Sequence, residues 1–88
     1  MKRSYQGLSL EIREKKECYL IVVEDRTDLN KHYKETIEAP KNNKHQCKKA
    51  LDKAKEWLWN MGSYNGQSNS FISKHHNEWI KALDLEVI

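Results

Sequence analysis

The feature that most constrains this chain is a change in the spacing of its apolar residues at Pro40. Before Pro40, apolar residues alternate with polar ones or form one short continuous run, as in strands. After Pro40, they recur every three or four positions, as on one face of a helix. Proline donates no hydrogen bond to a sheet ladder, so it marks the end of the last strand. The sequence therefore predicts an α+β fold, in which the strands of the sheet precede the helices along the chain.

Three segments before Pro40 are predicted to form an antiparallel sheet: residues 5–13, 18–24 and 32–38. In the first segment, Leu8, Leu10 and Ile12 alternate with polar residues, which is typical of a strand covered on one face. The second segment is almost continuously apolar, which favours the central position in the sheet. In the third segment, Tyr33 and Ile37 share one face.

Two amphipathic helices are predicted after Pro40, over residues 42–61 and 71–83. The first should begin at Asn42 or Asn43 as its N-cap and pack one apolar stripe on the sheet: Cys47, Ala50, Leu51, Ala54, Leu58 and Met61. The polar stretch 63–70 is predicted to be a linker, with a turn at Asn65-Gly66 and Ser70 as the second N-cap. The expected order is β-β-β-α-α in one domain, 1–88.

The length and the cysteine content limit the class of protein further. A chain of 88 residues supports one hydrophobic core. We find no signal-peptide pattern before the first strand, and no apolar run is long enough for a membrane span. The chain is therefore expected in the cytoplasm, where Cys18 and Cys47 should stay reduced.

No pattern in the sequence predicts catalysis, a cofactor, a metal site or a small-molecule substrate. The zinc-capable residues lack the paired spacing of known structural sites: Cys18, His45, Cys47, His75 and His76. Cys47 also lies in the middle of the predicted core stripe, where desolvation would suppress a reactive thiolate. The sequence therefore predicts a protein that is not an enzyme.

A lysine flank on the first predicted helix is the first candidate binding surface. Lys44, Lys48 and Lys55 fall on one side of the helix, and that side continues into Trp59, which lies away from the core stripe. Positive charge near a helix N-terminus is unfavourable for stability. This flank therefore either binds an acidic partner or a phosphate backbone, or serves as a solvated face.

The outer face of the sheet is the second candidate binding surface. If Leu8, Leu10 and Ile12 pack on the first helix, Arg13 points to the opposite face. The central strand must add either Leu20 and Val22 to that face or its alternate residues, Tyr19, Ile21 and Val23. An apolar patch inside a charged surround resembles a protein interface, unless the second helix or the tail 85–88 covers it.

The predicted order of three strands and a helix resembles the small DNA-binding domains at the N-termini of tyrosine recombinases. That resemblance implies a sheet laid into the DNA major groove. Here, however, Glu11 and Glu38 would face the phosphates, and Arg13 is the only arginine on that face. We therefore expect a small protein-interaction module, either a homodimer or an accessory or inhibitor protein of a bacterial or phage assembly. Nucleic-acid binding is the alternative.

Overall fold

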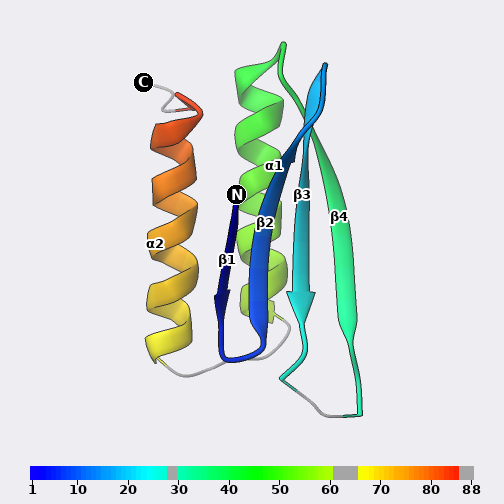
Figure 1. Ribbon diagram of the computed structural model, residues 1–88. Coiled ribbons are helices and arrows are strands. Elements are labelled where there is room, and N and C mark those ends of the chain that lie inside the picture. Colours follow the sequence, from blue (N-terminus) through cyan, green and yellow to red (C-terminus); the bar gives the residue numbers. More distant parts are fainter. Residues whose placement is uncertain (28–29, 61–65, 86–88) are drawn as a thin grey trace.

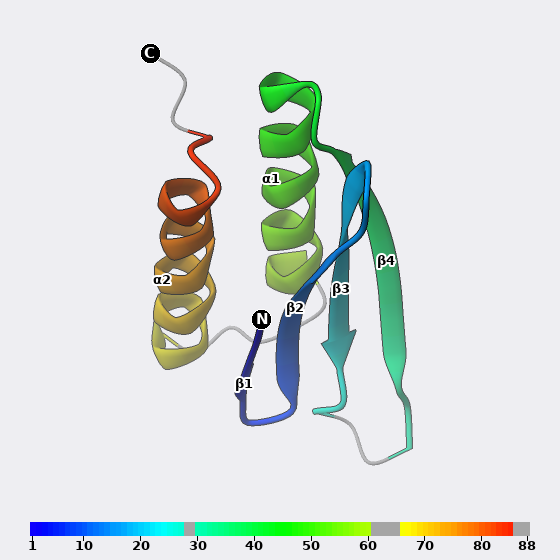
Figure 2. The ribbon, with the colours of Figure 1, turned by 45° about the horizontal axis from the view of Figure 1, so that its top comes forward.

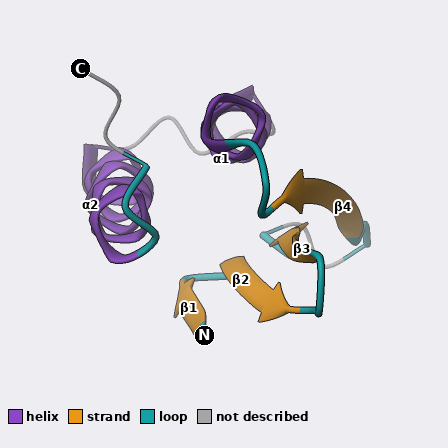
Figure 3. Ribbon diagram, turned by 90° about the horizontal axis from the view of Figure 1, so that it is seen from above, coloured by secondary structure: helices purple, strands orange, loops and turns teal. Residues whose placement is uncertain are grey.

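The computed structural model describes residues 1–27, 30–60 and 66–85. These residues form an antiparallel sheet in the order β1-β2-β3-β4, followed by two helices (Figure 1). The elements are β1 (Lys2–Tyr5), β2 (Leu8–Glu14), β3 (Cys18–Asp25), β4 (Tyr33–Pro40), α1 (Lys44–Asn60) and α2 (Gly66–Ala82). Both helices lie on the same face of the sheet (Figure 3). The predicted α+β class with an antiparallel sheet is confirmed.

The sheet has four strands, and the prediction of three was wrong. The segment expected to be one strand over residues 5–13 is a hairpin, in which Tyr5 pairs with Leu8. The turn consists of Gln6 and Gly7, whose φ angles are 46° and 90°. Two successive residues with positive φ match the twist of a tight antiparallel hairpin. Glycine reaches such φ values without steric strain, so Gly7 permits the turn.

Strands β2, β3 and β4 pair in the register expected for one buried face. Leu10 lies opposite Val23, and Ile12 lies opposite Ile21, which in turn lies opposite Ile37 on β4. These side chains face the helices because residues two apart in a strand share a face. Strand β4 continues through Pro40, two residues beyond its predicted end.

Helix α1 begins as its capping residue predicts. The side-chain Oδ1 of Asn43 accepts a hydrogen bond from the backbone N–H of Gln46 at 3.1 Å, which satisfies an N–H of the first turn. Five residues of the predicted stripe are buried: Cys47, Ala50, Leu51, Ala54 and Leu58. The sixth, Met61, lies outside the described residues.

Helix α2 begins at Gly66, five residues before its predicted start at residue 71, so Ser70 is not its N-cap. Asn65, the other half of the predicted turn, lies outside the described residues. Serine, asparagine and glutamine are only slightly unfavourable in a helix. A helix anchored further along by Ile72 and Trp79, both 0% exposed, can therefore extend backwards through a polar segment.

The core lies between the inner face of the sheet and the two helices. Helix α1 packs on β3 and β4, and α2 lies beside α1 and close to β1 (Figure 2). The ring of Tyr5 stacks on Phe71 at 5.6 Å between centroids, and Arg3 forms an ion pair with Glu78 at 3.0 Å. Leu85 is buried in the same core, whereas the rest of the tail lies outside the described residues. In the described part of the chain, neither helix has the length and apolar character to span a membrane.

Candidate interaction surfaces

Each lysine of the lysine flank has a partner within the chain. Lys44 Nζ lies 2.9 Å from Asp84 Oδ2, and Lys48 Nζ lies 3.2 Å from Asp52 Oδ2, one turn along α1. The ammonium of Lys55 sits over the ring of Trp59, 4.9 Å from its centroid. Part of the positive charge predicted for this flank is therefore already compensated within the chain. Trp59 itself remains 42% exposed.

The outer sheet face carries Leu20 and Val22, the first of the two predicted alternatives. Val22 lies between Glu11 on β2 and Thr36 on β4, and Arg13 lies opposite Leu20. No described element packs on this face (Figure 3). Its cross-strand neighbours nevertheless leave Val22 only 3% exposed. The accessible apolar patch is therefore narrow.

The open edge of the sheet at β4 is a third surface, which the sequence did not reveal. On one side β4 pairs with β3, and within the described residues no strand pairs with its other side. The backbone N–H of Lys41 donates to Glu17 O at 3.1 Å, and hydrogen-bonded pairs alternate along an antiparallel ladder. Every second residue of the strand therefore directs its backbone N–H and C=O away from the sheet. These residues define the β4 edge: Lys34, Thr36, Glu38 and Pro40.

Two local details support this phase of the ladder. The backbone N–H of Thr36 donates to Oε1 of its neighbour Glu35 at 3.1 Å, rather than to β3. Pro40 has no N–H, and its place on the outward row means that the ladder loses no hydrogen bond there. The β4 edge thus offers backbone donors and acceptors to another extended segment.

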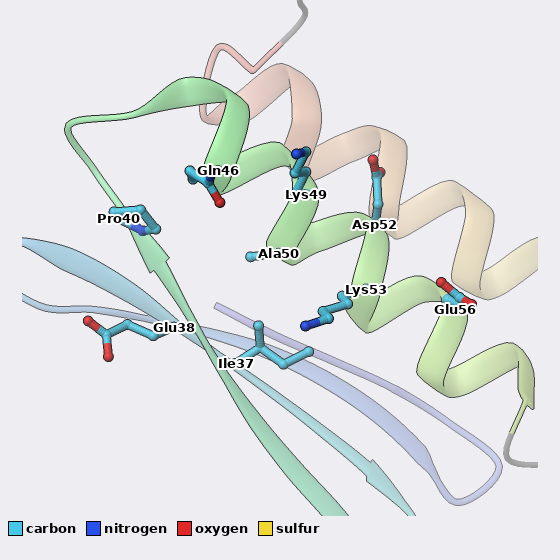
Figure 4. Close-up of a pocket in the computed structure, with 9 residues that line it drawn as sticks. All are labelled: Ile37, Glu38, Pro40, Gln46, Lys49, Ala50, Asp52, Lys53 and Glu56. Atoms are coloured by element: carbon cyan, nitrogen blue, oxygen red, sulfur yellow. The ribbon is translucent and has the colours of Figure 1, made fainter.

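A groove of about 400 Å³ runs between β4 and α1 (Figure 4). Ile37 points from β4 towards the helix, and Lys53 extends from α1 towards the strand. Pro40, Gln46 and Ala50 line one end of the groove with Lys49 beside them, and Glu56 lies towards the other end (Figure 4). Among the described residues, no carboxylate lies within ion-pair distance of Lys53. Glu38, Lys49 and Asp52 complete the lining, so the groove combines apolar contacts at Pro40 and Ala50 with side chains of both charges.

A buried histidine joins the two helices through Asp52 of α1, which also belongs to the lining of the groove. His76 Nε2 lies 2.7 Å from Asp52 Oδ1, and its Nδ1 is buried without a hydrogen-bond partner among the described residues. Burial opposes ionisation of Asp52, but the hydrogen bonds from His76 and Lys48 and their charges outweigh it. The pKa of Asp52 is therefore lower than its ordinary value. The contact is structural in character, because it clamps α2 against α1.

Among the residues that the structure describes, the other titratable groups do not form a cluster of metal-binding side chains. The described residues contain no group of three or more His, Cys, Asp or Glu side chains that could hold a metal ion. Cys18 and Cys47 form no disulfide. Burial raises the pKa of the Cys47 thiol, which disfavours the nucleophilic thiolate.

Sequence reasoning missed the residues around the β4 edge. Tyr33 is 40% exposed at the start of the strand, and Glu35 and Lys53 line the space beside it. The available signal was the strand order itself, because a central second strand leaves the third strand at an edge.

The comparisons with known proteins give no relative. No protein-family model matches the sequence, and no curated protein or solved structure matches it significantly. The architectural resemblance to recombinase domains therefore has no support from a matched structure. Function must be argued from the surfaces themselves.

Proposed function

We propose that this chain is a small, non-catalytic protein-interaction module that acts in the cytoplasm as a dimer or as an accessory or inhibitor protein. The observation that carries the proposal is the β4 edge, an exposed strand edge directly beside a groove. An extended segment that adds to a sheet edge gains affinity from main-chain hydrogen bonds and specificity from pockets for alternate side chains. The β4 edge supplies the first, and the groove beside α1 supplies the second.

The groove lies on the correct side for this mode of binding. Side chains of an added strand alternate between the two faces of the sheet. Those on the inner face would enter the groove between Ile37 and Lys53. Those on the outer face would extend the row that contains Leu20 and Val22. One added segment would therefore contact both the groove and the narrow apolar patch.

Nucleic-acid binding, through the lysine flank or the sheet, is the competing class of function. The ion pairs of Lys44 and Lys48 reduce the charge available for phosphates. On the outer face, Arg13 is paired with Glu11 at 2.8 Å, which compensates the charge of the one arginine expected to contact phosphates. These contacts favour a protein partner. The two classes also differ in salt dependence, because phosphate contacts weaken steeply as salt rises.

The experiment that tests the proposal compares Thr36→Pro with Thr36→Val. The proline removes an N–H that makes no bond to β3, whereas the valine keeps that N–H. Both variants should melt close to the unmodified chain. An immobilised unmodified chain and Thr36→Val should retain the same protein from an extract of the source cells at 0.5 M salt, and Thr36→Pro should not. Retention by Thr36→Pro that equals that of the unmodified chain would contradict binding at this edge. Retention of nucleic acid alone, lost at high salt, would favour the competing class.

A further inference from the structure

The outward residues of β4 are self-complementary in charge. The β4 edge carries Lys34, then Thr36, then Glu38, so a cation and an anion lie symmetrically about a neutral centre. An antiparallel strand with the same sequence, centred on Thr36, would place each Lys34 opposite Glu38 of the second copy. We infer that the segment added at the β4 edge is β4 of a second copy of this chain, related by a two-fold axis at Thr36. This inference rests on the proposed function, of which it names the partner.

The register follows from the alternatives. An antiparallel pair centred on Lys34 or on Glu38 would place two like charges directly opposite, which is destabilising. Moving the centre to Glu35 would bring the two Glu35 carboxylates together. A centre at Ile37 would set Lys34 opposite Pro40, which has no N–H to donate. Centring on Thr36 gives three hydrogen-bonded pairs of two bonds each and two opposite-charge pairs.

The inner face of this pairing fits the groove. In the register centred on Thr36, Tyr33 of the second copy lies opposite Ala39, beside Pro40 and Ala50 in the groove. Tyr33 is one of the few large hydrophobic side chains that the described residues leave exposed. Its ring would be covered on pairing.

The charged part of the groove finds a matching carboxylate in the same register. Glu35 of the second copy lies opposite Ile37, on the side of β4 towards which Lys53 extends from α1. A charge that points inward usually protects a sheet edge from pairing. Here the lysine that would neutralise it is already in place. The hydrogen bond between Glu35 and the N–H of Thr36 would be exchanged for backbone bonds across the seam, which is the line along which the two β4 edges pair.

The decisive test uses charge reversals at the two ends of the seam, read by sedimentation equilibrium and light scattering. The unmodified chain should show twice its 10.5 kDa mass. Lys34→Glu alone and Glu38→Lys alone each turn both attractive pairs repulsive, so each should weaken dimerisation at least about tenfold. An equimolar mixture of the two variants should form a heterodimer, because both of its pairs are again opposite in charge. The double variant Lys34→Glu/Glu38→Lys should also dimerise like the unmodified chain.

Recovery of the dimer in the double variant distinguishes an effect on the pairing of the two β4 strands from an effect on the fold of each chain. Lys34→Glu places a carboxylate opposite Glu24 within its own chain. The double variant keeps that intramolecular clash, so its recovery cannot come from a repaired monomer. Tyr33→Ser should weaken the dimer. Trp59→Ser, a matched change at the exposed tryptophan on α1, should leave it unchanged.

A chain that stays monomeric up to millimolar concentration would overturn this inference, and so would single reversals that leave the dimer intact or a mixture that fails to associate. The proposed function would still stand if Thr36→Pro, and not Thr36→Val, abolished capture of another protein. If Thr36→Pro retained both self-association and capture of another protein, the inferred dimer and the proposed function would both be overturned.

Discussion

The turn between β1 and β2 offers the sharpest test of the fold, through the substitution Gly7→Ala. Gly7 has φ of +90°, where a side chain is strained, and a Cβ added there would lie 3.1 Å from Thr27 N and 3.2 Å from Arg26 C. Both neighbours are backbone atoms, which cannot move away by rotating a side chain. The backbone N–H of Arg26 also donates to Gly7 O at 2.8 Å, which holds the two segments together.

The expected loss follows from these two effects. Left-handed backbone costs an alanine about 1–2 kcal/mol, and relief of the close contacts adds a further fraction, so we expect about 1–3 kcal/mol in total. For a domain of this size each kcal/mol lowers the melting temperature by about 4–8 °C. Urea unfolding at 25 °C, followed by far-ultraviolet circular dichroism, measures the free energy directly.

The control for this experiment is Gln6→Gly, at φ of 46° in the same turn. Glycine relieves strain at that position but gives the unfolded chain more freedom, so its net effect should stay within about 1 kcal/mol. If Gly7→Ala were as stable as the unmodified chain, the turn would not have the geometry described, and the pairing of β1 with β2 would be refuted.

Three further predictions concern the core, the helix contact and the buried thiol. Leu51→Ala, at a side chain 1% exposed, should lower the free energy of unfolding by about 2–5 kcal/mol in the same urea assay; a loss below about 1 kcal/mol would place Leu51 outside the core. Asp52→Asn should destabilise the chain at pH 7, and the difference should shrink as the pH falls through the lowered pKa of Asp52, below the ordinary 3.8. Urea unfolding at pH 7 and pH 3 checks this, and a difference independent of pH would contradict the role of the carboxylate. Cys18 should react with a thiol reagent faster than Cys47, whose pKa burial raises; mass spectrometry of Cys18→Ser and Cys47→Ser gives the two rates, and equal rates would contradict the burial of Cys47.

Elements governed by local chemistry were the predictable part of this fold. The stripe on α1 follows from side-chain spacing alone, and the cap at Asn43 needs only a hydrogen bond to a residue three positions later. The continuous apolar run of β3 likewise predicted a strand that pairs on both sides, although the sheet has four strands rather than three. In each case the residues that decide the structure are neighbours in sequence.

Elements that depend on distant packing were not predictable. Strand β1 has no apolar alternation, and its inner side chains Arg3 and Tyr5 find their partners on α2. The early start of α2 likewise depends on the anchoring of its later turns. Neither signal is present in the local sequence.

The candidate surfaces divide in the same way. Sequence spacing placed the lysine flank on one side of α1 but not Asp84, the partner of Lys44, because the two residues are 40 positions apart. The face of Leu20 and Val22 followed from alternation once the burial of Ile21 was known. The groove beside Lys53 arises only when α1 folds back over β4, so no local sequence pattern predicts it.

The order of the elements also bears on how the chain folds. Each strand pairs with its neighbour in sequence, and α1 returns directly over β4, so most closures involve short loops. Proteins dominated by such contacts fold quickly. The contact of Arg3 with Glu78 is different, because it joins residues 75 positions apart. Folding should therefore proceed from β2, β3, β4 and α1 outward, with the first strand and the last helix docking together at the end.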